Sequence, residues 1–140
     1  MSTVLWANTL IDGAVDSDES DKFTLFRHSK KLEKLTNQLK VTSFISTQDF
    51  TDMQFNLSAD DLPEGMESTD ELMAEKGVWV SGVDAVVMLE NLISHISTNK
   101  INFGLLKNDF EEILIELKDS LESAIKAKSA NGMFNFSVVM

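Results

Sequence analysis

Residues 105–140 read LLKNDFEEILIELKDSLESAIKAKSANGMFNFSVVM, a helix pattern followed at once by a strand pattern. Apolar side chains recur at spacings of three and four, which predicts an amphipathic helix over about 105–129. Its expected core positions are Leu106, Phe110, Ile113, Leu114, Leu117, Leu121, Ala124 and Ile125. The pair Asn131-Gly132 favours a left-handed helix stop, and the alternating apolar residues after it predict a C-terminal strand.

The C-terminal strand needs a paired neighbour, because an open apolar edge invites aggregation. Residues 3–11 (TVLWANTLI) are rich in β-forming side chains and end at the turn residues Asp12-Gly13. We therefore expect the first and last strands to pair. The residues around and after the turn, 12–21, carry five acids and no base, and we expect them to form an acidic loop.

The middle of the chain predicts two more helices and two short extended segments. One helix covers about 20–39 and places His28 inside its apolar stripe. The other covers 82–97, with so wide an apolar arc that we expect neighbours on two of its sides. Residues 53–57 (MQFNL) alternate as in a half-buried strand, and residues 77–80 predict a short strand.

The order of elements is strand, helix, strand, strand, helix, helix, strand, and it predicts an α+β fold. We expect a small mixed or antiparallel sheet of about four strands, with helices packed on one face in two layers. A chain of 140 residues suits a single domain, residues 1–140. Acidic loops near 12–21 and 58–76 complete it, the second with a helical turn around 71–76.

The charge of the chain is strongly negative and unevenly distributed. Its 12 Lys and Arg face 23 Asp and Glu, for a net charge of −11. Residues 22–40 sum to +5, from six bases and Glu33, whereas residues 41–76 sum to −8, from nine acids and Lys76. A balance of this kind argues against direct binding of nucleic acid or of an anionic membrane.

The composition excludes several kinds of site. The absence of cysteine excludes disulfides, thiol catalysis and cysteine-based metal sites. The chain contains no HExxH, Walker A, GxGxxG or GxSxG motif. A calcium-loop-like start at Asp16 fails, because Asp21 replaces the turn glycine and Arg27 the bidentate glutamate. We therefore assign no catalytic residue, no metal and no cofactor.

The sequence also bears on location. Residues 1–13 contain no Lys or Arg, and the longest unbroken apolar run is residues 85–89. These features predict neither a secretory signal nor a membrane span. We expect a cytoplasmic protein that binds no membrane, and the oligomeric state stays open between a monomer and a homo-oligomer.

Four segments carry a resemblance to other proteins: residues 20–40, TQDFTDMQFNL (47–57), the Trp79 strand that leads into a helix, and GMFNFSVVM (132–140). Together they resemble a group of small acidic bacterial proteins of unassigned function, over most of the chain. The resemblance implies a bacterial, cytoplasmic protein. It implies no activity and no catalytic residue.

These features favour a non-catalytic interaction or regulatory protein, similar in class to an inhibitor or an immunity protein. Its acidic surface would bind a partner with a basic surface, and salt would weaken the binding. The candidate contact residues are Phe23 and Phe26, which project toward the bases of the first helix, and Asp60, Asp61 and Glu64 in the acidic segment.

The alternative is a small-ligand-binding protein or an enzyme with a pocket between sheet and helices. His28 would be its pH-sensitive group, and Asp49 and Asp52 its paired carboxylates. Trp79 and Ser81 stand where a strand leads into a helix, whose first backbone N–H groups attract anions. A nucleic-acid mimic is a third interpretation, which the clustering of the acids in a loop disfavours.

Overall fold

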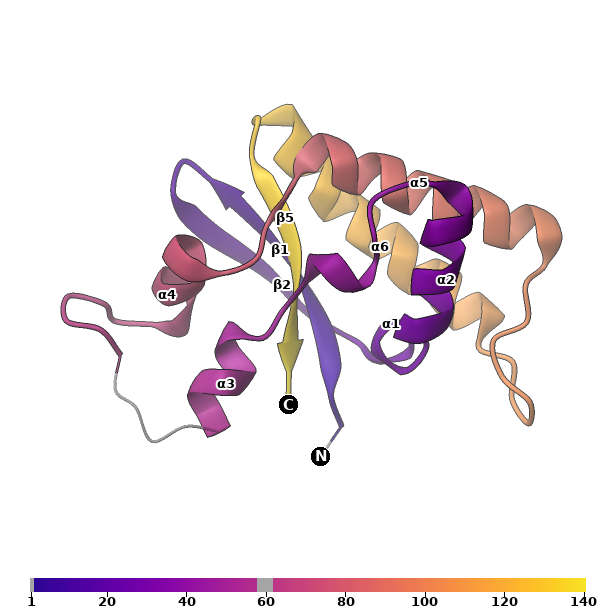
Figure 1. Ribbon diagram of the computed structural model, residues 1–140, viewed down its shortest axis with the longest axis horizontal. Helices are drawn as coiled ribbons and strands as arrows, with labels where there is room; N and C mark the ends of the chain where they lie inside the picture. Colours follow the sequence, from indigo (N-terminus) through magenta and orange to yellow (C-terminus); the bar gives the residue numbers. More distant parts are fainter. Residues whose placement is uncertain (1, 58–61) are drawn as a thin grey trace.

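The computed structural model describes residues 2–57 and 62–140. Its sheet is built around the neighbouring strands β1 (Val4–Ile11) and β5 (Met133–Val139), which run antiparallel to one another. The predicted pairing of the first and last strands is therefore confirmed. The strand β2 (Ala14–Lys22) continues the sheet beyond β1, again antiparallel (Figure 1).

Two very short strands complete the sheet on the other side of β5. The strand β3 (Gln48–Asp49) runs parallel to β5 and pairs with Phe136 and Ser137. The strand β4 (Val80–Ser81) runs antiparallel to β5 and pairs nearer its start. The two short strands thus follow one another along the same edge, and the sheet is mixed but mainly antiparallel.

Six α-helices accompany the sheet in the described part of the chain. They are α1 (Phe23–Arg27), α2 (Ser29–Leu39), α3 (Thr51–Leu57), α4 (Thr69–Lys76), α5 (Gly82–Asn99) and α6 (Phe110–Ser129). A 3₁₀ turn, η1 (Ile45–Thr47), precedes β3. An open sheet with its long helices packed on one face is the α+β, two-layer fold class that the order of elements predicts. Within residues 2–57 and 62–140, no helix is long and apolar enough to cross a membrane.

The main core lies between the sheet and the long helices. On β1, Leu5 and Ala7 face this core together with Phe134 and Phe136 of β5, and all four are fully buried. The helix α5 contacts α6 on one side and α2 on another, which confirms the two-sided packing expected from its wide apolar arc. Figure 1 shows α5 and α6 side by side against the sheet.

The opposite face of the sheet is covered in part by α4. Alternation along β1 turns Asn8 away from the main core, and its Nδ2 lies 3.8 Å from Met73 Sδ of α4. Asn8 Nδ2 also donates to Asn135 Oδ1 at 3.0 Å, and Asn135 Nδ2 donates to Val78 O at 2.8 Å. This buried amide pair ties the central strands to the segment after α4.

The segment 14–22 is a strand, so the prediction of an acidic loop there is wrong. Asp12 and Gly13 both have positive φ, 51° and 80°, which is the backbone of a tight two-residue hairpin turn. Asp-Gly is a strong hairpin signal, but the acids that follow it are untypical of a strand. They are tolerated because β2 is an edge strand, where charged side chains reach solvent.

Two predictions for the segments between β2 and α4 are also wrong. The expected helix over 20–39 begins at Phe23 and breaks at His28, whose φ of −103° and ψ of 23° separate α1 from α2. The expected strand 53–57 is helical and belongs to α3. In the backbone of α3, Thr51 N donates to Asp49 Oδ1 at 2.9 Å, which supports the first turn of the helix.

The start of the last helix differs from the prediction as well. The helix α6 begins at Phe110 rather than at 105, so Leu106 is fully exposed instead of occupying a core position. Gly104 has a φ of +142°, a backbone angle that residues with a side chain rarely adopt, and it turns the chain into a loop before α6. Ile125 also lies largely in solvent, whereas the other predicted core positions are buried or partly buried.

Candidate functional site

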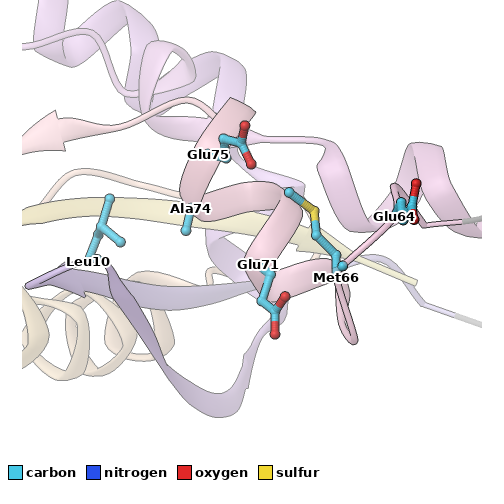
Figure 2. Close-up of a pocket in the computed structure, with 8 residues that line it drawn as sticks. Leu10, Glu64, Met66, Glu71, Ala74 and Glu75 are labelled. Carbon is cyan, nitrogen blue, oxygen red and sulfur yellow. The ribbon is translucent and has the colours of Figure 1, made fainter.

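A hollow in the surface lies between the turn that joins β1 to β2 and the helix α4 (Figure 2). Its volume is about 520 Å³, within the range of ordinary ligand sites. It is lined by Leu10, Gly13, Glu64, Gly65, Met66, Glu71, Ala74 and Glu75. We call this set of residues the acidic concavity.

The lining of the acidic concavity has two chemical components. Glu64, Glu71 and Glu75 are exposed carboxylates, and no lysine or arginine stands among the lining residues. Leu10 and Met66 add partly buried apolar surface beside them. A ligand that fits both components is a cationic side chain with an apolar neighbour or stem, such as those of lysine and leucine in a peptide.

Local sequence explains how the two sides of the concavity are shaped. Met66 N donates to Pro63 O at 3.1 Å, closing a turn in which Gly65 has a φ of +88°. Gly65 occupies the third position of this turn, where a positive φ favours glycine, and Pro63 stands at the first position. Ser68 then caps α4, because its Oγ accepts a hydrogen bond from Glu71 N at 3.4 Å. The cap places Glu71 in the first turn of α4, where its Oε2 also accepts a hydrogen bond from Glu67 N at 3.2 Å.

A second hollow, of about 370 Å³, lies between β2 and α6 and has a lysine side chain, Lys126, in its lining. Lys126 Nζ lies 2.8 Å from Asp16 Oδ2 there, so one lysine of this chain already neutralises part of the lining. The acidic concavity has no base in its lining. It is therefore the better candidate for a cationic partner.

Further negative charge lies beside the acidic concavity. Burial raises the pKa of Asp70, and the nearby carboxylates of Asp52 and Glu19 raise it further. Asp52 Oδ1 accepts a hydrogen bond from Thr69 Oγ1 at 3.0 Å, which orients it toward α4. The cavity that Asp52 and Asp70 help to line is about 30 Å³, room for roughly one water molecule. These acids add to the field of the region.

The residues of the predicted ligand pocket are engaged by separate contacts. His28 Nε2 lies 2.8 Å from Asp109 Oδ2, and the imidazole meets the Phe103 ring edge-on at 5.4 Å between centroids. Asp52 belongs to α3 and accepts from Thr69 of α4, and Figure 1 shows these two helices away from α1 and α2. His28 thus has the structural role of a packed, hydrogen-bonded histidine.

The other three members of that set hold β4 and its flanks in place. Asp49 is buried and accepts from Val78 N at 2.7 Å. Trp79 Nε1 donates to Met73 O at 2.9 Å. Ser81 is the N-cap of α5, and its side chain accepts from a backbone N–H in the first turn. Each polar group therefore has a structural partner in the fold.

The predicted aromatic contact residues are only partly available to a partner. The guanidinium Cζ of Arg27 lies 4.5 Å from the centroid of the Phe23 ring, a cation–π arrangement. Phe26 is partly buried and packs against the main core. Phe23 thus keeps some surface beside a base, whereas Phe26 contributes to the fold.

The structure places only one of the three predicted acidic contact residues. Glu64 lines the acidic concavity, and Asp60 and Asp61 lie outside the described residues. The sequence pattern did not single out Glu71 and Glu75, although both belong to the same acidic run. The available signal was the helical turn around 71–76, which places residues four apart on one helix face.

A loop between α5 and α6 is a second surface feature that the sequence did not predict. We call residues 100–109 the leucine loop. At its tip, Leu105 and Leu106 have relative exposures of 101% and 105%, so their side chains contact almost nothing in the fold. In contrast, Phe103 in the same loop is fully buried and anchors it beneath His28.

No protein-family model, curated protein or solved structure matches this chain. Over residues 2–57 and 62–140, no group of three or more His, Cys, Asp or Glu side chains is placed to hold a metal ion. The resemblance to small bacterial proteins stays a prediction. The acidic concavity and the leucine loop are the features on which a functional proposal can rest.

Proposed function

We propose that the protein is a non-catalytic interaction protein that binds a basic, partly apolar segment of a protein partner in its acidic concavity. The observation that carries the proposal is the lining itself: three glutamates beside apolar side chains, without an internal base, in a hollow of about 520 Å³. The net charge of −11 would steer a basic partner toward this surface.

The chemistry of the concavity predicts how such binding behaves. Glu64, Glu71 and Glu75 are exposed, so each ion pair with a partner contributes only about 0–1 kcal/mol and is screened by salt. Apolar contact with Leu10 and Met66 supplies the part of the affinity that salt leaves unchanged. Binding is therefore expected to weaken with ionic strength without vanishing.

An inhibitor-like or immunity-like role fits this mode of binding, since such proteins neutralise a basic partner by covering its surface. A cytoplasmic location and a bacterial origin belong to the same proposal and are supported by the resemblance stated above. A small-ligand or enzymatic function has less support, because His28, Asp49, Trp79 and Ser81 are engaged in structural contacts.

The test uses a short synthetic peptide of alternating lysine and leucine, with a glutamate–leucine peptide as its control. Amide chemical shifts of the full chain are followed by NMR during titration at low and high salt. We expect shifts near Leu10, Met66 and Glu71 with the lysine peptide, weaker at high salt. Shifts spread evenly over the surface, or equal shifts with the acidic peptide, would argue against the proposal.

A matched pair of variants separates the site from general charge. The concavity variant, E64Q/E71Q/E75Q, removes three charges from the lining. The control variant, E90Q/E111Q/E122Q, removes three charges from exposed glutamates of α5 and α6. We expect the concavity variant to bind the lysine peptide about tenfold or more weakly, which corresponds to three exposed pairs. The control variant should retain most of the affinity.

A further inference from the structure

The leucine loop presents adjacent apolar side chains to solvent from an ordered support. Single exposed leucines are common on protein surfaces, but Leu105 and Leu106 are neighbours at one tip and are both fully exposed. An exposed apolar pair of this kind is typical of a contact site. The surroundings of the pair indicate which kind of partner surface would bind it.

The loop is held in shape by contacts at its base. Asn108 Oδ1 accepts hydrogen bonds from Phe103 N at 2.8 Å and from Phe110 N at 3.1 Å. Asp109 N donates to Phe103 O at 2.9 Å, and Asn102 Nδ2 donates to Gly104 O at 2.9 Å. The two leucines are thus carried on a closed loop, so binding orders few additional residues.

Basic side chains stand around the leucine tip, and two of them also meet carboxylates of their own chain. The Lys107 side chain, directly after the leucines, is 74% exposed, and its Nζ lies 3.6 Å from Glu112 Oε1 and 4.0 Å from Asp109 Oδ1. The Arg27 side chain is 53% exposed, with Nη1 3.5 Å from Asp109 Oδ2. Ion pairs this exposed are weak, so the carboxylates of a partner can replace them. Lys31 donates to the backbone O of Asn102 and lies over the Phe103 ring, 5.1 Å from its centroid. A surface that covers the tip should therefore offer apolar contact and carboxylates together.

The acidic concavity of this same chain offers that combination. Figure 1 shows α4 at one end of the molecule and the loop between α5 and α6 at the other, so a loop cannot reach the concavity of its own chain. We propose that the leucine loop of one copy binds in the acidic concavity of a second copy. This inference rests on the proposed function, because it names the segment that the concavity takes.

The contact would join two different surfaces of the same protein. Such an interface either repeats from copy to copy or is exchanged reciprocally in an antiparallel pair. In both arrangements Leu105 and Leu106 meet Leu10 and Met66, while Lys107 meets the glutamates. The association is therefore expected to strengthen with protein concentration and to weaken with salt.

An anionic lipid surface is the competing occupant of a basic, apolar loop tip. The net charge of −11 opposes the approach of the whole molecule to an anionic membrane and to a second copy alike. The concavity of a second copy, however, offers apolar side chains and carboxylates in one hollow, which matches the leucines and Lys107 of the tip. This local match favours a second copy of the chain, and lipid binding becomes an outcome of the test.

The experiment measures self-association of the full chain by sedimentation velocity over a range of protein and salt concentrations. It compares the wild type with a loop variant, L105S/L106S, and with the concavity variant, E64Q/E71Q/E75Q. I115S, which changes another exposed apolar residue, is the control. We expect each test variant to raise the dissociation constant about tenfold or more, as loss of buried apolar area or ion pairs predicts. I115S should behave as the wild type.

Mixing the two test variants gives the sharpest result. The loop variant keeps an intact concavity, and the concavity variant keeps an intact loop, so an equal mixture can form one contact of the proposed kind. We expect a heterodimer in the mixture at protein concentrations where each variant alone is monomeric. Self-association that survives in both variants would overturn the inference, and so would a mixture that stays monomeric.

Two further measurements distinguish a failure of this inference from a failure of the proposed function. The loop variant is titrated with the lysine–leucine peptide, since its concavity is intact. Peptide binding together with a wild type that stays monomeric at all concentrations would overturn this inference and leave the proposed function standing. The second measurement is co-sedimentation of the protein with vesicles of phosphatidylglycerol and phosphatidylcholine. If the wild type is monomeric and binds these vesicles, and L105S/L106S does not bind them, the loop is assigned to lipid instead.

Discussion

The imidazole Nε2 of His28 lies 2.8 Å from the buried Oδ2 of Asp109, although 81 residues separate them in sequence. His28 stands at the break between α1 and α2, and Asp109 is the N-cap residue of α6. Arg27 Nη1 lies 3.5 Å from the same carboxylate oxygen. This pair fastens the base of the leucine loop to the point where α1 gives way to α2.

Asp109→Asn should destabilise the protein by about 1–3 kcal/mol near neutral pH, because it disrupts a buried, charge-assisted contact. The hydrogen bond with His28 is the main reason that the pKa of Asp109 lies below its usual 3.8. Burial opposes that shift, and the charges of His28, Arg27 and Lys107 reinforce it.

The sign of the pH dependence follows from that lowered pKa. A carboxyl group with a lowered folded pKa contributes stability above its unfolded pKa and loses it as pH falls through the folded value. The gap in unfolding free energy between wild type and D109N should therefore narrow below about pH 4. Urea unfolding at several pH values measures it, with exposed Asp119→Asn as the control. A gap that stays constant down to low pH would contradict the assignment.

Glu116→Gln should leave the protein as stable as the wild type near neutral pH, or raise its unfolding free energy by less than about 1 kcal/mol. Burial raises the pKa of Glu116, while the hydrogen bond from Leu25 N, at 3.1 Å, partly offsets the rise. Glutamine removes the buried charge and keeps an acceptor for Leu25.

The pH dependence of the Glu116 variant has the opposite sign to that of Asp109. A carboxyl group with a raised folded pKa costs stability at high pH, and the cost disappears as pH falls below its unfolded value. The advantage of E116Q should therefore be largest near neutral pH and shrink below about pH 4. A large loss of stability in E116Q at neutral pH would show that the carboxylate is needed as such.

Gly82→Ala should destabilise the protein by about 3 kcal/mol or more, because it crowds backbone rather than a flexible side chain. A Cβ at Gly82 would lie 2.4 Å from Lys128 N and 2.7 Å from the carbonyl carbon of Ala127. The start of α5 therefore packs directly on the end of α6. Thermal unfolding of G82A beside V83A, at an exposed neighbouring position, measures the effect. Equal melting temperatures for the two variants would contradict it.

Lys22→Met should cost less than about 1 kcal/mol, whereas Lys22→Ala should cost about 2 kcal/mol or more. The Lys22 side chain is 1% exposed, and its Nζ lies 3.1 Å from Asp18 Oδ2 and 2.8 Å from Ser20 Oγ. Asp18 keeps access to water, so loss of its partner is compensated by solvent. Methionine retains the packing of the alkyl chain and removes only the charge. Chemical denaturation of both variants therefore separates the contribution of the packed alkyl chain to stability from that of the ammonium group. A larger loss in K22M than in K22A would reverse this interpretation.

Long regular patterns were the most reliable guide to secondary structure. The helices α5 and α6 have apolar periodicity over several turns, and this length excludes a strand. Residues 53–57 are too short for such a decision. In MQFNL, Met53 and Phe55 alternate as in a strand, but Met53 and Leu57 are also four apart as on a helix face. Asp49 resolves the ambiguity by accepting from Thr51 N in the first turn of α3.

The sequence predicts less of the site than of the fold. Glu64 lies in an acidic run that marks it as a contact residue, but Leu10 and Met66 carry no local mark of a shared surface. The spacing of Leu106 from Phe110 fits the periodic pattern and therefore predicts a helix at what is an exposed loop tip. Hydrogen bonds to Asn108 replace the first expected turn and hold the loop instead.

Composition and local periodicity were enough for the α+β class, the pairing of β1 with β5, the negative charge and the exclusion of cysteine chemistry. The class, the charge and the exclusion depend on counts or on residues close together in the chain, and the pairing follows from the need of an apolar terminal strand for a partner. The acidic concavity and the leucine loop arise only on folding. Packing of α4 against the sheet brings Leu10 beside Ala74, and the contact of His28 with Asp109 shapes the loop. Such contacts join residues far apart in sequence, and no local pattern encodes that separation.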